Sequence, residues 1–229
     1  MKKVIRAKDF KVLSGSWLKV IAMVTMAIDH AASGLDYFQQ SPELYVAMRT
    51  IGRMAFPIFA FLVVEGYVHT RSRRKYARNM LVVALISQVP WALAHSDASY
   101  WLRGNVCFTL LLGLLAMYVW DKMQPSPVRR NLCLVALFVG AVLLRTDYSY
   151  YGVGVILLLY VLRAHAGLRL LLGACVVARR FFIGVAFGFG LLALYNGQRG
   201  FIKGSIGKYL FYAFYPLHLL IIYFLQQVI

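Results

Sequence analysis

The chain alternates long apolar runs with short polar segments, and within a run the apolar residues are continuous. The runs cover 16–34, 46–69, 77–95, 105–121, 129–146, 151–164, 167–178, 181–195 and 207–228. A helix needs about 20 residues to cross a bilayer, and shorter helices occur inside bundles. The continuous runs favour helices over strands, because the edge of an open sheet would leave backbone groups without hydrogen-bond partners in lipid. We therefore predict an all-α, polytopic bundle of about nine (eight to ten) transmembrane helices.

The stretch 167–195 admits either two short helices or one long helix. Two helices would place Arg179 and Arg180 at the tip of a hairpin. One long helix would move the basic residues of 199–208 to the outer side, against the rule that cationic loops stay in the cytoplasm. We therefore predict two helices.

The composition supports a membrane protein. Of the 229 residues, 61% are hydrophobic and 14% are charged, whereas a soluble domain has about 45–50% apolar and about 25% charged residues. The length fits a single integral membrane domain spanning 1–229. The three cysteines form no CxxC pair, so we predict neither a disulfide nor a metal site.

The positive charge indicates orientation rather than nucleic-acid binding. The net charge is +17, and the basic residues lie between apolar runs. With the N-terminus in the cytoplasm, the cytoplasmic segments hold 18 Lys and Arg and the opposite side holds six. This bias predicts a cytoplasmic N-terminus. The cationic loops would lie against the anionic lipid of the bilayer, and we expect no nucleic-acid partner.

Ionisable residues inside the apolar runs are candidates for function because their burial in lipid is costly. Asp29 and His30 end the first run, and Arg49 and Arg53 share one face of the second. A histidine near a carboxylate can act as a general base, although adjacent residues on a helix point apart and the partner could lie elsewhere. A polar cap at the membrane surface is the alternative. Glu65 is the one acid deep in an apolar run, and it fits either a structural clamp or a site.

A basic cluster follows the second run and comprises His69, Arg71, Arg73, Arg74 and Lys75. Topology and contact with lipid headgroups explain such a cluster in most membrane proteins. The alternative is a site for polyphosphate, which Arg side chains bind through forked hydrogen bonds.

Two further segments carry candidate chemistry. The sequence YNGQRG at 195–200 contains Asn196 and Arg199, and its glycines could let backbone N–H groups approach a phosphate. The last run begins with Lys208 and contains Tyr215 and His218. A lone buried histidine is usually a hydrogen-bonded core residue, but the neighbouring Tyr and Pro favour a lined cavity.

These segments together resemble the TraX family. The blocks that carry the resemblance follow the family's order and cover nearly the whole chain: LKVIAMVTMAIDH, GRMAFPIFAFLVVEGYVHTRSRRKYARNMLVVALISQVPW, NVCFTLLLGLLA, DYSYYGVGVILLL, LYNGQRG and KYLFYAFYPLHLLII. The family is similar to a wider group of transmembrane acyltransferases that includes the acyltransferase-3 proteins and the lysosomal heparan glucosamine N-acetyltransferase. The chain departs from the family in a shortened 165–181 stretch.

The resemblance implies an acetyltransferase of the bacterial inner membrane that takes acetyl groups from acetyl-coenzyme A. The acceptor implied is the N-terminal amine of a conjugative pilin or a similar small membrane peptide. The functional histidine of the wider group matches His30, which Asp29 would orient, while Arg49 or Arg53 would stabilise the oxyanion. A covalent acetyl-His intermediate is the alternative mechanism.

The same resemblance implies that basic residues at the cytoplasmic face bind coenzyme A, without a metal. The candidates for this binding are His69, Arg71, Arg73, Arg74, Lys75, Asn196, Arg199, Lys208, Tyr215 and His218. Transfer to a sugar or another cell-envelope acceptor is a second possibility, and a small-molecule transporter without bond chemistry is a third.

Overall fold

The computed structural model describes residues 11–35, 37–95, 97–177, 182–202 and 204–228. Within these ranges the regular structure is helical, and the β pairing is one isolated parallel bridge between Leu13 and Tyr195. The predicted basic residues at 2–8, the hairpin-tip pair Arg179 and Arg180, and Lys203 lie outside the described residues.

Every apolar run of the sequence forms helix in the structure, which confirms the all-α prediction. The helices are α1 (Gly15–Gly34), α2 (Tyr37–Gln40), α3 (Pro42–Gly52), α4 (Ala55–His69), α5 (Arg73–Ile86), α6 (Gln88–Leu93), η2 (Ala98–Leu102), α7 (Val106–Lys122), α8 (Pro127–Leu143), α9 (Ser149–Val161), α10 (Ala166–Val177), α11 (Phe182–Ala193) and α12 (Gly204–Gln226). The two helices predicted over 167–195 are present as α10 and α11, which pack against each other.

Two of the runs contain a break. The run over 46–69 is interrupted between α3 and α4, so Pro57 falls in the first turn of α4, where its missing N–H costs no helical hydrogen bond. The run over 77–95 breaks at Ser87, between α5 and α6. Asn105 strengthens this second break, because its side-chain amide donates to the Ala84 carbonyl at 2.8 Å and to Gln88 Oε1 at 2.9 Å.

Length and composition qualify part of the described chain for crossing a bilayer. Three helical segments are long and apolar enough, namely Pro42–His69, Ala98–Lys122 and Gly207–Gln226, and α9, α10 and α11 are shorter apolar helices. The nine-span topology and the cytoplasmic N-terminus stay predictions. Large apolar side chains are exposed along the outer helices, as on α8, α11 and α12, which is the surface that lipid would cover.

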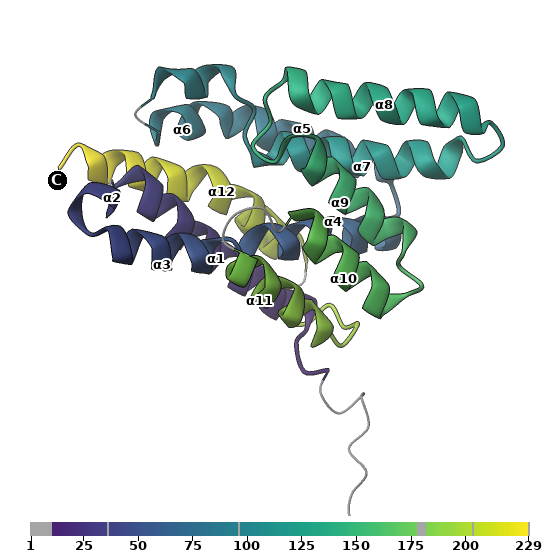
Figure 1. Ribbon diagram of the computed structural model, residues 1–229, viewed down its shortest axis with the longest axis horizontal. Coiled ribbons are helices and arrows are strands. Elements are labelled where there is room, and N and C mark those ends of the chain that lie inside the picture. Colours follow the sequence, from purple (N-terminus) through teal and green to yellow (C-terminus); the bar gives the residue numbers. More distant parts are fainter. Residues whose placement is uncertain (1–10, 36, 96, 178–181, 203, 229) are drawn as a thin grey trace, which may run out of the picture.

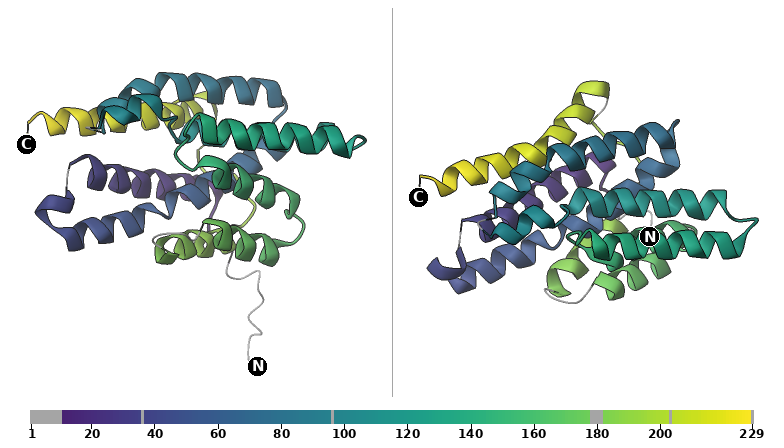
Figure 2. Two further views of the ribbon diagram at one scale, coloured as in Figure 1. Left: turned by 45° about the horizontal axis from the view of Figure 1, so that its top comes forward. Right: turned by 90° about the horizontal axis from the view of Figure 1, so that it is seen from above.

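Helix α4 lies in the middle of the bundle (Figures 1 and 2). It contacts α1 on one side, α7 and α9 on another, and α11 on a third. Around it, α1 packs with α3 and α12, while α7 packs with α5, α8 and α9. A helix that is apolar on all faces belongs in such an interior position.

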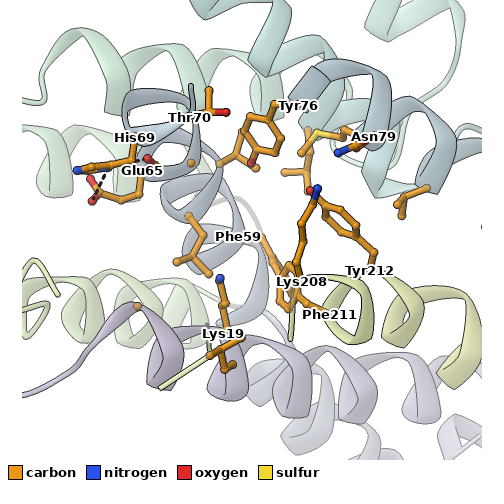
Figure 3. A pocket seen from close by; sticks show the side chains of 18 of the residues that line it. Lys19, Phe59, Glu65, His69, Thr70, Tyr76, Asn79, Lys208, Phe211 and Tyr212 are labelled. Atoms are coloured by element: carbon orange, nitrogen blue, oxygen red, sulfur yellow. Dashed lines mark hydrogen bonds and ion pairs between the residues drawn. The ribbon is translucent and has the colours of Figure 1, made fainter. Parts of the chain in front are cut away.

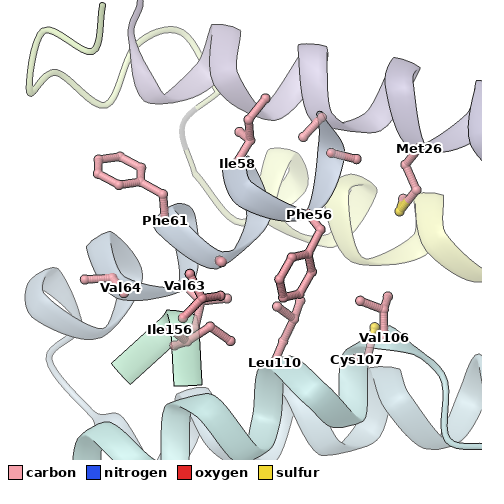
Figure 4. Close-up of a cluster of buried hydrophobic side chains, with 14 of the residues drawn as sticks. Met26, Phe56, Ile58, Phe61, Val63, Val64, Val106, Cys107, Leu110 and Ile156 are labelled. Carbon is pink, nitrogen blue, oxygen red and sulfur yellow. The ribbon is translucent and has the colours of Figure 1, made fainter. Parts of the chain in front are cut away.

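The core is built around the side chains of α4 (Figure 4). Phe56, Ile58 and Phe61 are each at most 2% exposed. They belong to one cluster with Leu110 of α7 and Ile156 of α9. Burying a side chain of this size stabilises the fold by roughly 1.5–3 kcal/mol in water; in a bilayer the gain comes chiefly from close packing.

Two glycines of α11 let this helix approach the α3–α4 junction closely. A Cβ on Gly184 would overlap the Thr50 carbonyl oxygen, and a Cβ on Gly188 would lie 3.0 Å from the Met54 carbonyl oxygen. Small residues four positions apart commonly allow membrane helices to pack backbone against backbone. The glycine pair therefore fixes the position of α3 just beside Arg53.

We expect Gly184→Ala to destabilise the protein, because its methyl group would collide with backbone that has no room to move. Overpacking of this kind costs about 1–3 kcal/mol. Gly190→Ala on the same helix is the matched control, since nothing lies within 4 Å of a Cβ there. Thermal unfolding in detergent would show a lower midpoint for Gly184→Ala and an unchanged or higher one for Gly190→Ala. Equal midpoints would contradict the close packing.

Candidate functional site

Asp29, near the end of α1, forms an ion-pair cluster with two arginines. Its Oδ2 accepts a hydrogen bond from Arg49 Nη1 at 2.8 Å, and its Oδ1 lies 3.7 Å from Arg53 Nη2. Arg49 also donates to the Asp29 carbonyl oxygen at 3.3 Å. The three side chains are only 13–20% exposed. The two arginines that the sequence places on one face of a helix thus share a single carboxylate.

The surroundings of this cluster hold it in place. A Cβ on Gly52 would overlap the Asp29 side chain, so glycine at this position allows α3 to approach α1. Arg53 also donates to the Tyr148 hydroxyl at 3.3 Å, and the Tyr148 ring stacks on Phe56 with 3.6 Å between centroids. The cluster therefore connects α1, α3 and the start of α9.

His30 is paired with His218 of α12 rather than with Asp29. His30 Nδ1 and His218 Nε2 are 2.7 Å apart, and each residue is 7% exposed. Asp29 follows the helical geometry in pointing away from its neighbour, toward the arginines. The Trp91 and Tyr215 rings lie near His30, with centroids 5.6 Å and 6.1 Å from that of His30.

A cavity of about 670 Å³ opens between α1, α4, α5 and α12 (Figure 3). At one end its wall carries five cationic side chains and His69, with Glu65 as the acidic member. The cations are Lys19, Arg71, Lys75, Arg199 and Lys208. Toward the other end the wall becomes apolar, with Met26, Val106, Cys107 and Leu110, and includes Tyr215. Tyr215 stands between this part of the cavity and the histidine pair.

Helix α1 runs along the cavity and connects its two ends. Lys19, Met23 and Met26 line the wall, and His30 follows at the same helical spacing. Eleven residues make three helical turns, so Lys19 and His30 lie on one face, about 16 Å apart along the axis. In Figure 3 the Lys19 side chain points from α1 into the cavity.

The loop 195–202 is fastened to the N-terminus of α1. The Gly15 N–H donates to the Gln198 carbonyl at 2.8 Å, and Ser16 Oγ donates to the Arg199 carbonyl at 2.9 Å. Gly200 has a φ of 85°, and a Cβ there would overlap Ser14 Oγ. This requirement for glycine explains part of the YNGQRG pattern, and the result is that Arg199 is held in the cavity wall.

Glu65 lies at the basic end of the cavity, away from His30. It is ten residues beyond the start of α4, or about 15 Å along the helix. Tyr195 donates to its Oε2 at 3.1 Å, and His69 Nδ1 lies 4.0 Å from the same oxygen. Glu65 and His30 therefore belong to opposite ends of the site.

Four of the predicted coenzyme A ligands are not in the cavity wall. His218 is paired with His30 instead. Arg73 forms a 2.8 Å ion pair with Asp121, which also accepts hydrogen bonds from Tyr67 and Tyr160. Arg74 is exposed outside the wall. Asn196 accepts a hydrogen bond from the Gln198 N–H at 2.9 Å and so shapes the loop.

Lys19 and the pairing of His30 with His218 are parts of the site that were not predicted from the sequence. The helical spacing from Lys19 to His30 was a usable signal, because it places a cation and an imidazole on the same face. The distance from residue 30 to residue 218 gave no such signal, since a contact across the bundle depends on tertiary packing.

Comparisons with known proteins identify a family and a relative. A family model described as "TraX protein" matches residues 14–226. A curated protein of Dichelobacter nodosus, "Probable fimbrial assembly protein FimC, serogroup H1", is 31% identical over 229 residues, covering 88% of this chain and 91% of that protein. No solved structure matches the chain.

We expect Asp29→Asn to destabilise the protein, because it removes the carboxylate that pairs with the partly buried guanidinium group of Arg49 and lies near that of Arg53. Removing one partner of a buried ion pair costs about 3–5 kcal/mol, and the partial exposure here reduces this to about 2–4 kcal/mol. Glu43→Gln, an exposed site at the start of α3, removes the same charge as a control. Unfolding midpoints in detergent should separate the two variants, and similar midpoints would argue against the cluster.

Proposed function

The chain belongs to the TraX family, and from this membership and the geometry of the site we propose that it is a membrane-embedded acetyltransferase. It transfers the acetyl group of cytoplasmic acetyl-coenzyme A to an acceptor amine, the N-terminus of a pilin. One observation carries the proposal, namely the cavity that begins among cationic side chains and leads toward a buried histidine pair.

The basic end of the cavity suits the phosphates of the donor. Arg71, Lys75, Arg199 and Lys208 contribute positive charge from three separate segments, and Lys19 adds a fifth cation. Phosphate oxygens are bound well by such charge-assisted hydrogen bonds. Because a polyanion cannot enter lipid, this end would face the cytoplasm, as the charge bias of the loops predicts.

The apolar part of the cavity suits the uncharged arm and its thioester. Met26, Val106 and Leu110 give this part of the wall an apolar surface. A thioester that reaches Tyr215 would lie at the part of the wall behind which His30 is buried, with 6.1 Å between the ring centroids of Tyr215 and His30, while the phosphates stay at the basic end. Low water content strengthens the electrostatic interactions that act on the reacting atoms.

In the proposed reaction, the nitrogen of the neutral acceptor amine attacks the thioester carbonyl carbon. At the same time His30 accepts a proton from this amine. The C–N bond forms, and the tetrahedral intermediate collapses by breaking the C–S bond. The departing thiolate takes the proton from His30, so the products are an acetylated amine and coenzyme A thiol. A covalent acetyl-His30 intermediate would divide the same exchange into two steps.

Arg49 and Arg53 stabilise the structure through Asp29, in addition to any role in catalysis. Arg49 is hydrogen-bonded to Asp29, and this pair holds the end of α1 that carries His30. Arg53 lies farther from the carboxylate, with 3.7 Å from its Nη2 to Asp29 Oδ1, and also donates to the Tyr148 hydroxyl; we assign the oxyanion to either arginine. A donor aimed at a developing negative charge contributes about 3–4 kcal/mol.

The acceptor is the least constrained part of the proposal. The related protein of Dichelobacter nodosus is named for fimbrial assembly, and the family resemblance implies pilin, so we propose a pilin N-terminus.

We expect His30→Ala to abolish acetyl transfer while leaving coenzyme A binding intact. The imidazole is needed for proton transfer, worth about 100-fold to 10,000-fold in rate, whereas the phosphates bind at the far end of the cavity. The measurement is transfer of labelled acetyl to a pilin-like peptide with a free N-terminal alanine, using purified protein in liposomes. Transfer by His30→Ala at the wild-type rate would remove His30 from the mechanism. Coenzyme A release without labelled peptide would indicate a different acceptor.

We expect Arg71→Ala and Lys75→Ala to raise the KM for acetyl-coenzyme A, because each removes a cation from the cavity wall. A charged hydrogen bond contributes about 1.5–3 kcal/mol, so the expected rise is about 10-fold to 100-fold. Arg74→Ala is the matched control, since it removes the same charge next to the cavity but outside its wall. Equal effects of all three substitutions would indicate a general electrostatic effect and argue against a site in this cavity.

A further inference from the structure

We propose that His218 is a positioning residue that fixes the tautomer of His30, so that Nε2 of His30 is its unprotonated and reactive nitrogen. The catalytic consequence rests on the proposed acetyl transfer, whereas the tautomer itself does not.

The backbone sets the proton position on His218. His218 Nδ1 lies 2.8 Å from the Phe214 carbonyl oxygen, one turn earlier in α12. A carbonyl oxygen can only accept a hydrogen bond, so the proton of His218 is on Nδ1. A neutral imidazole carries one ring proton, and Nε2 of His218 is therefore an acceptor.

His30 must then be the donor in the contact between the two rings. The distance of 2.7 Å from His30 Nδ1 to His218 Nε2 is shorter than the ~3.5 Å of a van der Waals stack, which makes it a hydrogen bond. The ring planes differ by 10°. With its proton on Nδ1, His30 has an unshared electron pair on Nε2, as a general base or a nucleophile requires.

The opposite proton order would need a buried cation. If His218 were charged, it would donate from Nε2, and His30 could keep its proton on Nε2. Such a cation requires a nearby carboxylate, and the carboxylate of Asp29 is bound by Arg49 and lies near Arg53. With each histidine only 7% exposed, the neutral pair is the favoured state.

The pairing also serves the reaction. When His30 Nε2 accepts a proton from the amine, the Nδ1–H bond to His218 becomes a charge-assisted hydrogen bond and stabilises the cation. The Trp91 ring packs against His30 in a T-shaped contact, with 5.6 Å between the ring centroids. His218 acts through His30 and would not touch the substrate.

The direct test is nitrogen NMR of histidine-labelled protein in detergent. The chain has five histidines, so a His30→Gln sample assigns the His30 signals. We expect Nδ1 of His30 to be protonated and Nε2 to be unprotonated in the wild type. His218→Phe keeps a ring but removes the acceptor, and should move the His30 proton to Nε2, whereas His218→Gln offers an amide oxygen and should retain the wild-type tautomer. His95→Gln, which alters a ring 6.3 Å from His30, is the control and should change nothing.

A wild-type His30 protonated on Nε2, or a tautomer unaffected by His218→Phe, would overturn the proposal. In the transfer assay, His218→Phe should lower kcat by about 100-fold with an unchanged KM for acetyl-coenzyme A, and His218→Gln should recover part of the rate. Equal losses in both variants would overturn the positioning role. If the wild type transfers no acetyl group, the proposed function fails, and the NMR result still decides the tautomer.

Discussion

The ion pair between Asp29 and Arg49 is the contact on which the geometry of the site depends. A charge within an apolar bundle is costly unless it is paired and hydrogen-bonded, so α1 can place Asp29 there only if α3 supplies the arginines. Gly52 allows α3 to approach α1, and Gly184 and Gly188 of α11 pack closely against the α3–α4 junction. Because His30 follows Asp29 directly, the packing that neutralises the carboxylate also sets the position of the imidazole.

The cavity separates two chemical requirements along the face of α1. Cations gather at the Lys19 end, where a charged ligand group can remain near water, and the wall becomes apolar toward Tyr215. A donor with a polyphosphate head and a neutral arm is complementary to this gradient, whereas a small polar solute would meet an apolar wall before it reached the histidines. Membership of the TraX family and this gradient are independent observations that support the same proposed activity.

The sequence predicts the helices well because continuous apolar runs in lipid leave the backbone no alternative to the helix. It also identifies Asp29, His30, Arg49 and Arg53 as candidates, since each is costly in an apolar segment. It assigns their partners less well. Asp29 lies beside His30 in the chain yet binds arginines, and His218 reaches His30 only because α12 packs against α1. Arg73 illustrates the same difficulty, because its pairing with Asp121 on α7 cannot be read from a cluster of basic residues.

The central claim is that the cavity carries the donor from its basic end to the histidine pair. The most direct measurement is a cryo-electron microscopy structure of the protein, enlarged by a bound antibody fragment, with a non-transferable acetyl-coenzyme A analogue. The account predicts phosphate density beside Arg71, Lys75 and Arg199, and the acetyl end next to Tyr215 and His30. The contrary result would be an analogue bound elsewhere and lipid in the cavity. In a protein preparation that transfers acetyl groups, this result would contradict the account.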